Sequence, residues 1–92
     1  MAKIEKEIIV ENKKGLHARP AAVFVQLAEK FDVTVSVGKG EETVNGKSIM
    51  GLLMLGAQHQ TSLKLVVEGA DAPKAMAEFE GFFKKQEEEY MA

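Results

Sequence analysis

Apolar and polar residues alternate in several short stretches of this chain, and in the stretches between them apolar residues recur every three or four positions. Alternation is typical of a half-buried strand, and the longer period of an amphipathic helix. Alternation predicts strands over residues 4–10, 33–37 and 63–67, and a short strand at 43–45 that follows a hairpin turn at 38–41. The helical period predicts helices over residues 18–31, 49–55 and from 72 to the acidic run at 87–89.

The residues at or just before the three predicted helix starts are of types that favour those positions. Pro20 falls in the first turn of its helix, where a missing N–H has no intrahelical partner. Ser48 and Asp71 precede the other two helices and are favoured N-cap residues. The chain therefore reads as one domain over residues 1–92. Its expected order is β-α-β-β-α-β-α, an α+β open-faced sandwich with three helices on one face of a four-stranded antiparallel sheet.

Composition narrows the functional classes. The net charge of −2 argues against nucleic acid or an anionic membrane as the main partner, because both attract basic surfaces. No apolar run is long enough to span a bilayer, and the charged N-terminus does not look like a signal peptide. The absence of cysteine excludes a disulfide framework and a thiolate metal site. We expect a cytoplasmic protein with neither a metal nor another cofactor.

One segment, residues 15–22, suggests chemistry. It places His17 at the start of a helix, with Arg19 two residues later. The first N–H groups of a helix have no intrahelical acceptors, and the helix dipole adds positive charge there. A phosphoryl group on the His17 ring would meet the backbone amides of Ala18 and Arg19, and the Arg19 guanidinium would add charge-assisted hydrogen bonds. Taken alone, however, a histidine before a helix is more often an ordinary capping or exposed residue.

The sequence Gly-Leu-His-Ala-Arg-Pro-Ala at residues 15–21 resembles the active-site signature of the HPr family. These are histidine-containing phosphocarriers of the bacterial phosphoenolpyruvate-dependent phosphotransferase system. The similarity extends to the Lys-Ser-Ile-Met-Gly-Leu segment at 47–52 and to Val-Glu-Gly-Ala-Asp-Ala at 67–72. The resemblance implies a four-stranded antiparallel sheet covered on one face by three helices.

The resemblance also implies roles. His17 would accept a phosphoryl group through Nδ1 from phosphorylated enzyme I and pass it to the IIA domain of a sugar permease, with Arg19 assisting. Such a protein is a stoichiometric carrier and not an enzyme, and we expect it to be monomeric. In many Gram-positive relatives the serine that matches Ser48 is phosphorylated by an ATP-dependent kinase. A serine kinase/phosphorylase and a transcriptional regulator are therefore further candidate partners, although an N-cap role for Ser48 stands beside this interpretation.

The patch next to His17 is a candidate docking surface. Exposed apolar side chains with a basic rim suit transient binding to several partners. The candidates are Leu16, Lys47, Ile49, Met50 and Leu53, with Lys13, Lys14 and Arg19 as the rest of the rim. Some of the apolar residues must face the core, and periodicity does not tell which. Gly46 stands where many relatives have alanine, which we expect to loosen the approach to the helix at 49–55.

Three alternatives stay open at this point. The nitrogen-related NPr branch of the family uses the same histidine for regulation, and short phrases of this sequence resemble each branch. A serine-phosphorylated co-regulator is another, although such relatives have lost the histidine that this chain retains. An RNA-binding α+β domain fits poorly, because its strands would need aromatic residues. His59 lies in a polar turn without acidic neighbours, so we do not expect it to bind a metal.

Overall fold

The strands and helices follow one another in the predicted order. The computed structural model describes residues 2–11 and 13–90, and the side chains among them up to residue 84. Its elements are β1 (Ala2–Ile9), α1 (Ala18–Ala28), β2 (Val33–Lys39), β3 (Glu42–Asn45), α2 (Ile49–Leu55), β4 (Ser62–Gly69) and α3 (Ala72–Tyr90). The sequence therefore predicted every one of these elements.

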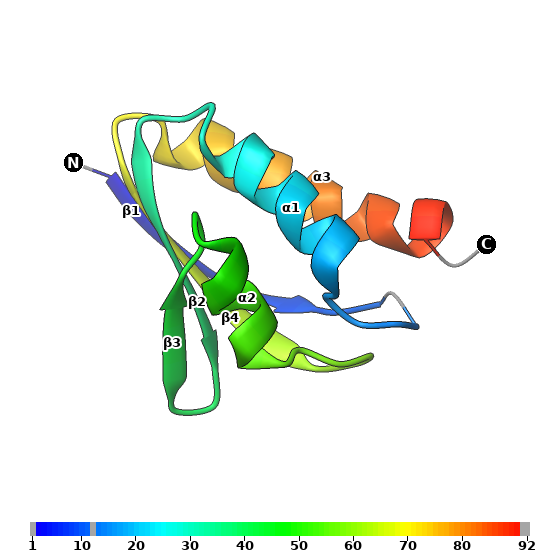
Figure 1. The fold of residues 1–92 in the computed structure, drawn as a ribbon. Helices are drawn as coiled ribbons and strands as arrows, with labels where there is room; N and C mark the ends of the chain where they lie inside the picture. Colours follow the sequence, from blue (N-terminus) through cyan, green and yellow to red (C-terminus); the bar gives the residue numbers. More distant parts are fainter. Residues whose placement is uncertain (1, 12, 91–92) are drawn as a thin grey trace.

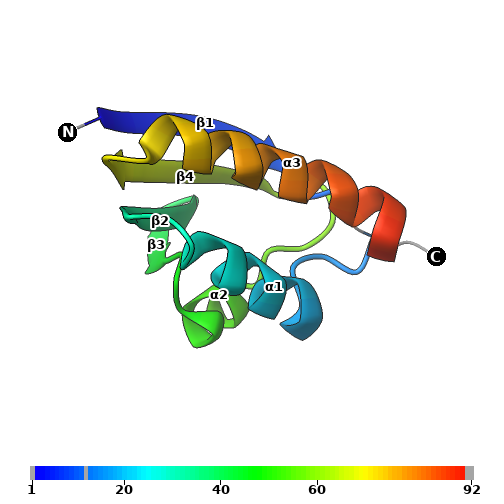
Figure 2. The same ribbon diagram turned by 90° about the horizontal axis from the view of Figure 1, so that it is seen from above.

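The strands form one antiparallel sheet in the order β1-β4-β2-β3. The central strands β4 and β2 have two neighbours each, and their apolar positions on the helix side are almost fully buried. All three helices cover that same side, as Figures 1 and 2 show. Helix α3 contacts β1 and β4, α2 contacts β2 and β3, and α1 packs between α2 and α3. This arrangement confirms the predicted open-faced sandwich.

Phenylalanines join α1 to α3 above the sheet. The Phe24 ring on α1 lies 4.9 Å from the ring centroid of Phe79, and it also contacts Phe82 and Phe83 at 5.4 and 5.7 Å. Tilted and edge-on geometries of this kind add about 0.5–1.5 kcal/mol per pair beyond the burial of the rings. Phe24 is 1% exposed, so the central residue of this cluster is inaccessible to solvent. The cluster fixes the direction of α1, and hence the position of its N-terminal residues.

The helix and turn boundaries differ from the sequence prediction at two places. Helix α1 ends at Ala28 and not near residue 31, because the amides of Lys30 and Phe31 bond three residues back and tighten the last turn. The hairpin loop is shorter than predicted: Lys39 still pairs with Glu42, which leaves residues 40 and 41 as the turn. The acidic run at 87–89 lies outside the described side chains.

Asp71 occupies the N-cap position of α3 as predicted. Its carbonyl accepts the first helical hydrogen bond, from the amide of Ala75 at 2.8 Å. Its carboxylate Oδ2 accepts from the backbone amide of Asp32 at 3.1 Å. Asp71 therefore joins the start of α3 to the turn between α1 and β2.

Charged side chains on β1 mark it as an edge strand. Lys6 lies in the same register as Ile4 and Ile8, toward the helices, and its ammonium binds the carboxylate of Glu80 on α3 at 3.0 Å. On the opposite face Glu5 binds Lys64 of β4 at 3.0 Å. The hydrogen bond from Lys64, together with the charge of its ammonium, lowers the pKa of the Glu5 carboxyl. Charges on an edge strand discourage pairing with other chains.

Gly46 brings the loop before α2 unusually close to the sheet. Its amide donates to the Val35 carbonyl at 2.8 Å, which continues the β2–β3 ladder by one bond. A Cβ at position 46 would lie 2.4 Å from Cγ1 of Val35. The glycine thus tightens the approach to α2. The sequence analysis had it loosening that approach, which was wrong because the β-branched Val35 fills the space of a methyl group at position 46.

We predict that Gly46→Ala lowers the free energy of unfolding by about 1–3 kcal/mol, the usual cost of overpacking a core. Gly81→Ala is the control, since a Cβ at Gly81 meets no atom within 4 Å. That substitution should stabilise α3 by about 0.5–1 kcal/mol. Urea denaturation measures both variants. Val35→Ala removes the methyl groups that the new Cβ would meet. The double variant should therefore lose less free energy of unfolding than the sum of the two single variants, and a loss equal to that sum would contradict the steric explanation.

Candidate functional site

His17 is the N-cap residue of α1. Its backbone is extended (φ −94°, ψ −170°), and its carbonyl accepts the first helical bond, from the amide of Ala21 at 3.0 Å. The imidazole makes no capping hydrogen bond to the helix, unlike the side chain of a typical N-cap residue. The ring is therefore not used to stabilise the helix start.

Backbone donors remain free beside this ring. The amide of His17 itself donates to Gly15 at 3.1 Å, and Pro20, the third residue of α1, has no N–H. The amides of Ala18 and Arg19 are the donors that precede the first helical bond, and both residues are exposed. Two amides at the positive end of a helix suit an anion. The binding of a phosphoryl group by the Ala18 and Arg19 amides stays a prediction.

The two ring nitrogens of His17 have different environments. Nε2 is buried and has no hydrogen-bond partner, the one such side-chain nitrogen or oxygen among the described residues. The residue as a whole is half-exposed. An unpaired buried polar group costs about 1–3 kcal/mol. Such groups in native proteins often mark functional sites.

Arg19 lies in the first turn of the same helix. It is the second residue of α1, its side chain is exposed, and it forms no ion pair or hydrogen bond with the other described side chains. A guanidinium without a partner at the start of a helix has five donors available for phosphoryl oxygens. His17 and Arg19, which the sequence analysis singled out together, thus lie at the same helix end.

The loop before His17 is held against the loop between α2 and β4, two segments that lie side by side in Figure 1. The amide of Leu16 donates to the Ala57 carbonyl at 2.8 Å. Gly15 has a positive φ of +73°, and a Cβ there would lie 2.5 Å from the same carbonyl oxygen. Val10 adds two further backbone bonds, to Gln60 and Thr61. The position of His17 therefore depends on a residue 40 positions further along the chain.

Leu16 does not belong to a docking surface. Its side chain is 7% exposed and lies in the core cluster, because the bond from Leu16 to Ala57 draws it inward. The predicted surface role of Leu16 is therefore wrong.

Helix α2 presents the exposed part of the apolar patch. Ile49, Met50 and Leu53 are 41%, 68% and 37% exposed. Met54, which the sequence analysis left out, is 76% exposed. Its position four residues after Met50 was the available signal, because residues four apart share one face of a helix. We call Ile49, Met50, Leu53 and Met54 the α2 patch.

Ser48 is the N-cap of α2, as one of its two interpretations predicted. Its hydroxyl oxygen accepts from the amide of Gly51 at 3.0 Å. The residue as a whole is half-exposed. Replacing such a cap by alanine typically costs about 1 kcal/mol.

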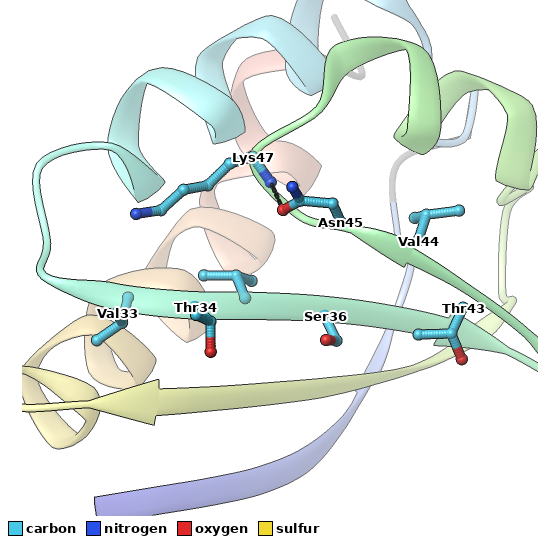
Figure 3. A pocket seen from close by; sticks show the side chains of 8 residues that line it. Val33, Thr34, Ser36, Thr43, Val44, Asn45 and Lys47 are labelled. Carbon is cyan, nitrogen blue, oxygen red and sulfur yellow. Dashed lines mark hydrogen bonds between the residues drawn. The ribbon is translucent and has the colours of Figure 1, made fainter. Parts of the chain in front are cut away.

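Lys47 is not part of a rim around His17. Its ammonium donates to the carbonyl of Phe31 at 3.2 Å, beyond the C-terminal end of α1. His17 is at the other end of α1, so the two groups are separated by roughly the length of an 11-residue helix, about 16 Å. Figure 3 shows the Lys47 side chain over a groove along the edge of β2, where Asn45 accepts from the Lys47 amide at 2.9 Å. That groove contains neither His17 nor Arg19.

Other classes of site find no support. The described residues contain no group of three or more acidic, histidine or cysteine side chains that could hold a metal ion. His59 is exposed in the turn between α2 and β4. Among the described helices none is long and apolar enough to cross a membrane.

Comparison with known proteins identifies relatives along most of the chain. The family described as "PTS HPr component phosphorylation site" matches residues 4–85. Phosphocarrier protein HPr of Treponema pallidum is 41% identical over 94% of this chain and 98% of its own length. HPr-like protein Crh of Halalkalibacterium halodurans is also 41% identical, over 90% of this chain and 99% of its own length. Phosphocarrier proteins named NPr are among the relatives as well.

Solved structures show the same fold. The crystal structure of HPr from Thermoanaerobacter tengcongensis superposes with a TM-score of 0.88 at 42% identity, and the match covers 94% of this chain and 97% of that one. Structures of dimers are also found among the relatives.

We predict that Gly15→Ala displaces the loop that carries His17. The substitution meets two costs, an unfavourable positive φ and the Ala57 oxygen at 2.5 Å. Together they should lower the free energy of unfolding by about 2–4 kcal/mol. Gly40→Ala is the matched control, since Gly40 has a φ of +60° but no atom within 4 Å of the added Cβ.

Gly40→Ala should cost only the backbone strain, about 1–2 kcal/mol. Urea denaturation and the amide NMR signals of Leu16 and His17 distinguish the two variants. Equal losses for Gly15→Ala and Gly40→Ala, with the Leu16 signal unmoved, would show that the contact with Ala57 does not position this loop.

Proposed function

The chain belongs to the HPr family of phosphotransferase-system phosphocarriers, and we propose that it accepts a phosphoryl group on Nδ1 of His17 from phosphorylated enzyme I and donates it to IIA domains. The observation that supports this proposal best is the asymmetry of the His17 ring. Its Nε2 is buried without a partner, the ring makes no capping bond, and the residue precedes the first two amides of α1. A histidine with only a structural role would use its ring for a hydrogen bond.

In the proposed transfer, the Nδ1 lone pair of a neutral His17 ring attacks phosphorus. The bond between phosphorus and the donor atom breaks, and its electron pair returns to the donor. The Nδ1–phosphorus bond formed is then broken in the same way by an acceptor on a IIA domain. Each phosphoryl group accepted is passed on, so the protein acts as a stoichiometric carrier and not as a catalyst.

The surroundings of His17 stabilise the charge of the phosphoryl group. The amides of Ala18 and Arg19 are already oriented by the helix, so they need no rearrangement at the moment of transfer. The Arg19 guanidinium, which has no partner among the described side chains, follows the phosphoryl oxygens as they move from donor to acceptor. The site therefore favours the group in transit and in the bound state, as a carrier requires.

The α2 patch is the proposed docking surface for enzyme I and IIA domains. It combines four exposed apolar side chains on one short helix, two of which are flexible methionines that adapt to different partners. The helix ends beside the loop that precedes His17, so a partner bound to α2 lies next to the phosphoryl site. Transient contacts of this kind suit a carrier that must leave each partner quickly.

We predict that enzyme I and labelled phosphoenolpyruvate transfer label to the wild type but not to His17→Ala. The label should be acid-labile, as expected for a phosphorus–nitrogen bond. His59→Ala is the control, because it removes the other histidine of the chain. It should accept label like the wild type. Labelling of His17→Ala, or no labelling of the wild type by any enzyme I that phosphorylates HPr relatives, would refute the carrier proposal.

We also propose that Ser48 is a regulatory phosphorylation site for a serine kinase/phosphorylase. A phosphate there would bring about −1.5 to −2 charge to the start of α2, beside the exposed Ile49 and Met50. The charge is compatible with the helix N-terminus, so its effect falls on partner binding and not on the fold. A transcriptional regulator that recognises the phosphoserine is the matching partner.

Incubation with ATP and an extract of the source organism tests this second site. We expect label on the wild type and none on Ser48→Ala, and slower transfer from enzyme I to the Ser48-phosphorylated protein. Ser62→Ala is a control with a serine elsewhere on the sheet. Label that persists in Ser48→Ala would exclude Ser48 as the target of such a kinase.

Two points of the proposal go beyond the family itself. We favour the sugar-transport branch over the nitrogen-related branch. A comparison of phosphoryl transfer to a IIA domain of a sugar permease and to a IIA domain of the nitrogen-related branch decides between them. We also propose a monomer that works in the cytoplasm, although a dimer of HPr from Thermoanaerobacter tengcongensis has been solved.

A further inference from the structure

The C-terminal end of α2 lacks a basic residue of its own. The helix ends at Leu55, and Gly56 closes it in the left-handed conformation at φ 65° and ψ 40°. No basic side chain lies in its last turn. The negative end of a helix is stabilised by a cation nearby, and its last carbonyls need donors.

Lys39, the last residue of β2, supplies both. Its half-buried side chain extends to α2, where the ammonium donates to the carbonyl of Leu55 at 3.1 Å and to that of Gly56 at 3.3 Å. One lysine therefore binds two successive carbonyls at the point where the helix turns into the loop before β4. The sequence analysis assigned no role to this residue.

The next peptide group is the one that holds the loop of His17. The Gly56 carbonyl bound by Lys39 belongs to the peptide bond between Gly56 and Ala57. The following carbonyl, that of Ala57, accepts from the amide of Leu16 at 2.8 Å. Ala57 is 4% exposed, so it is fixed by packing on the other side. Lys39 and the loop before His17 are thus connected through two adjacent peptide groups.

We propose that Lys39 is a positioning residue for phosphoryl transfer, which orients His17 through Gly56, Ala57 and Leu16. This inference rests on the proposed function of His17. Without the ammonium, the Gly56 carbonyl loses the donor that orients it, so the Gly56–Ala57 peptide and the Ala57 carbonyl that accepts from Leu16 are held less tightly. The His17 ring then samples orientations in which Nδ1 does not meet the phosphorus in line, which slows transfer without removing the acceptor.

The test compares Lys39→Met, which keeps a side chain of similar length without the charge, with Lys39→Arg, which keeps donors. Lys64→Met is the control for loss of one positive charge, since Lys64 binds Glu5 on the other face of the sheet. The measurements are the hydrogen-exchange rate of the Leu16 amide and the saturated rate of phosphoryl acceptance from enzyme I. Lys39→Gln is a milder second variant, to be used if Lys39→Met does not fold.

We expect Lys39→Met to raise the exchange rate of the Leu16 amide about tenfold through local opening. The kcat of enzyme I with this protein as the acceptor should fall by a similar factor, while the KM for this protein changes by less than about twofold. Lys39→Arg should restore both quantities, and Lys64→Met should change neither. A wild-type kcat and a wild-type Leu16 exchange rate in Lys39→Met would overturn the inference. So would a loss confined to KM, or an equal loss in Lys64→Met.

The failure of this inference is distinct from failure of the proposed function. If the wild type accepts no label from enzyme I, the proposed function is refuted, and Lys39 then has no transfer to assist. If the wild type accepts label and Lys39→Met accepts it at the same kcat, only the role of Lys39 is refuted.

Discussion

The hydrogen bond from the Leu16 amide to the Ala57 carbonyl, with Gly15 pressed against the same oxygen, determines where His17 lies. A residue other than glycine at position 15 would prevent this close approach, because the position requires both a positive φ and the absence of a Cβ. The contact buries Leu16, which anchors the loop in the core. It leaves His17 at the N-cap position of α1 with its ring unused by the helix. The functional part of the molecule thus follows from one backbone contact between two loops.

The ends of the helices are used in a consistent way. The N-terminus of α1 has two free amides and an arginine, and its positive end faces the proposed phosphoryl group. The C-termini of α1 and α2 lack basic residues of their own. Lysines from outside these helices supply them, Lys47 at the carbonyl of Phe31 and Lys39 at the last carbonyls of α2. At the C-terminal end of α2, and just beyond that of α1, a lysine from another part of the chain thus provides the cation that a helix dipole favours.

The order of strands and helices could be predicted from the sequence, because the alternation of the strands and the three- and four-residue spacing of the helices are both clear. The sequence also predicted a site at His17 and Arg19, whose neighbours form a recognisable motif, and the roles of these two residues stay a proposal. It did not predict the strand order, since pairing depends on contacts between residues far apart. Nor did it tell which apolar residues near His17 are exposed: Leu16 turns inward because of a hydrogen bond to Ala57, in a loop far along the chain. The hydrogen bonds of Lys47 and Lys39 could not be predicted either, because each lysine and the carbonyls it binds become neighbours only in the folded chain.

The proposed transfer centres on the two nitrogens of one ring: Nε2 of His17 is buried without a partner, and Nδ1 is the proposed acceptor. The most direct test is nitrogen-15 NMR of the protein labelled at histidine and phosphorylated by enzyme I. The account predicts that phosphorus couples to Nδ1 of His17 and that Nε2 carries the ring proton. Coupling to Nε2 of His17, or to either nitrogen of His59, would contradict it.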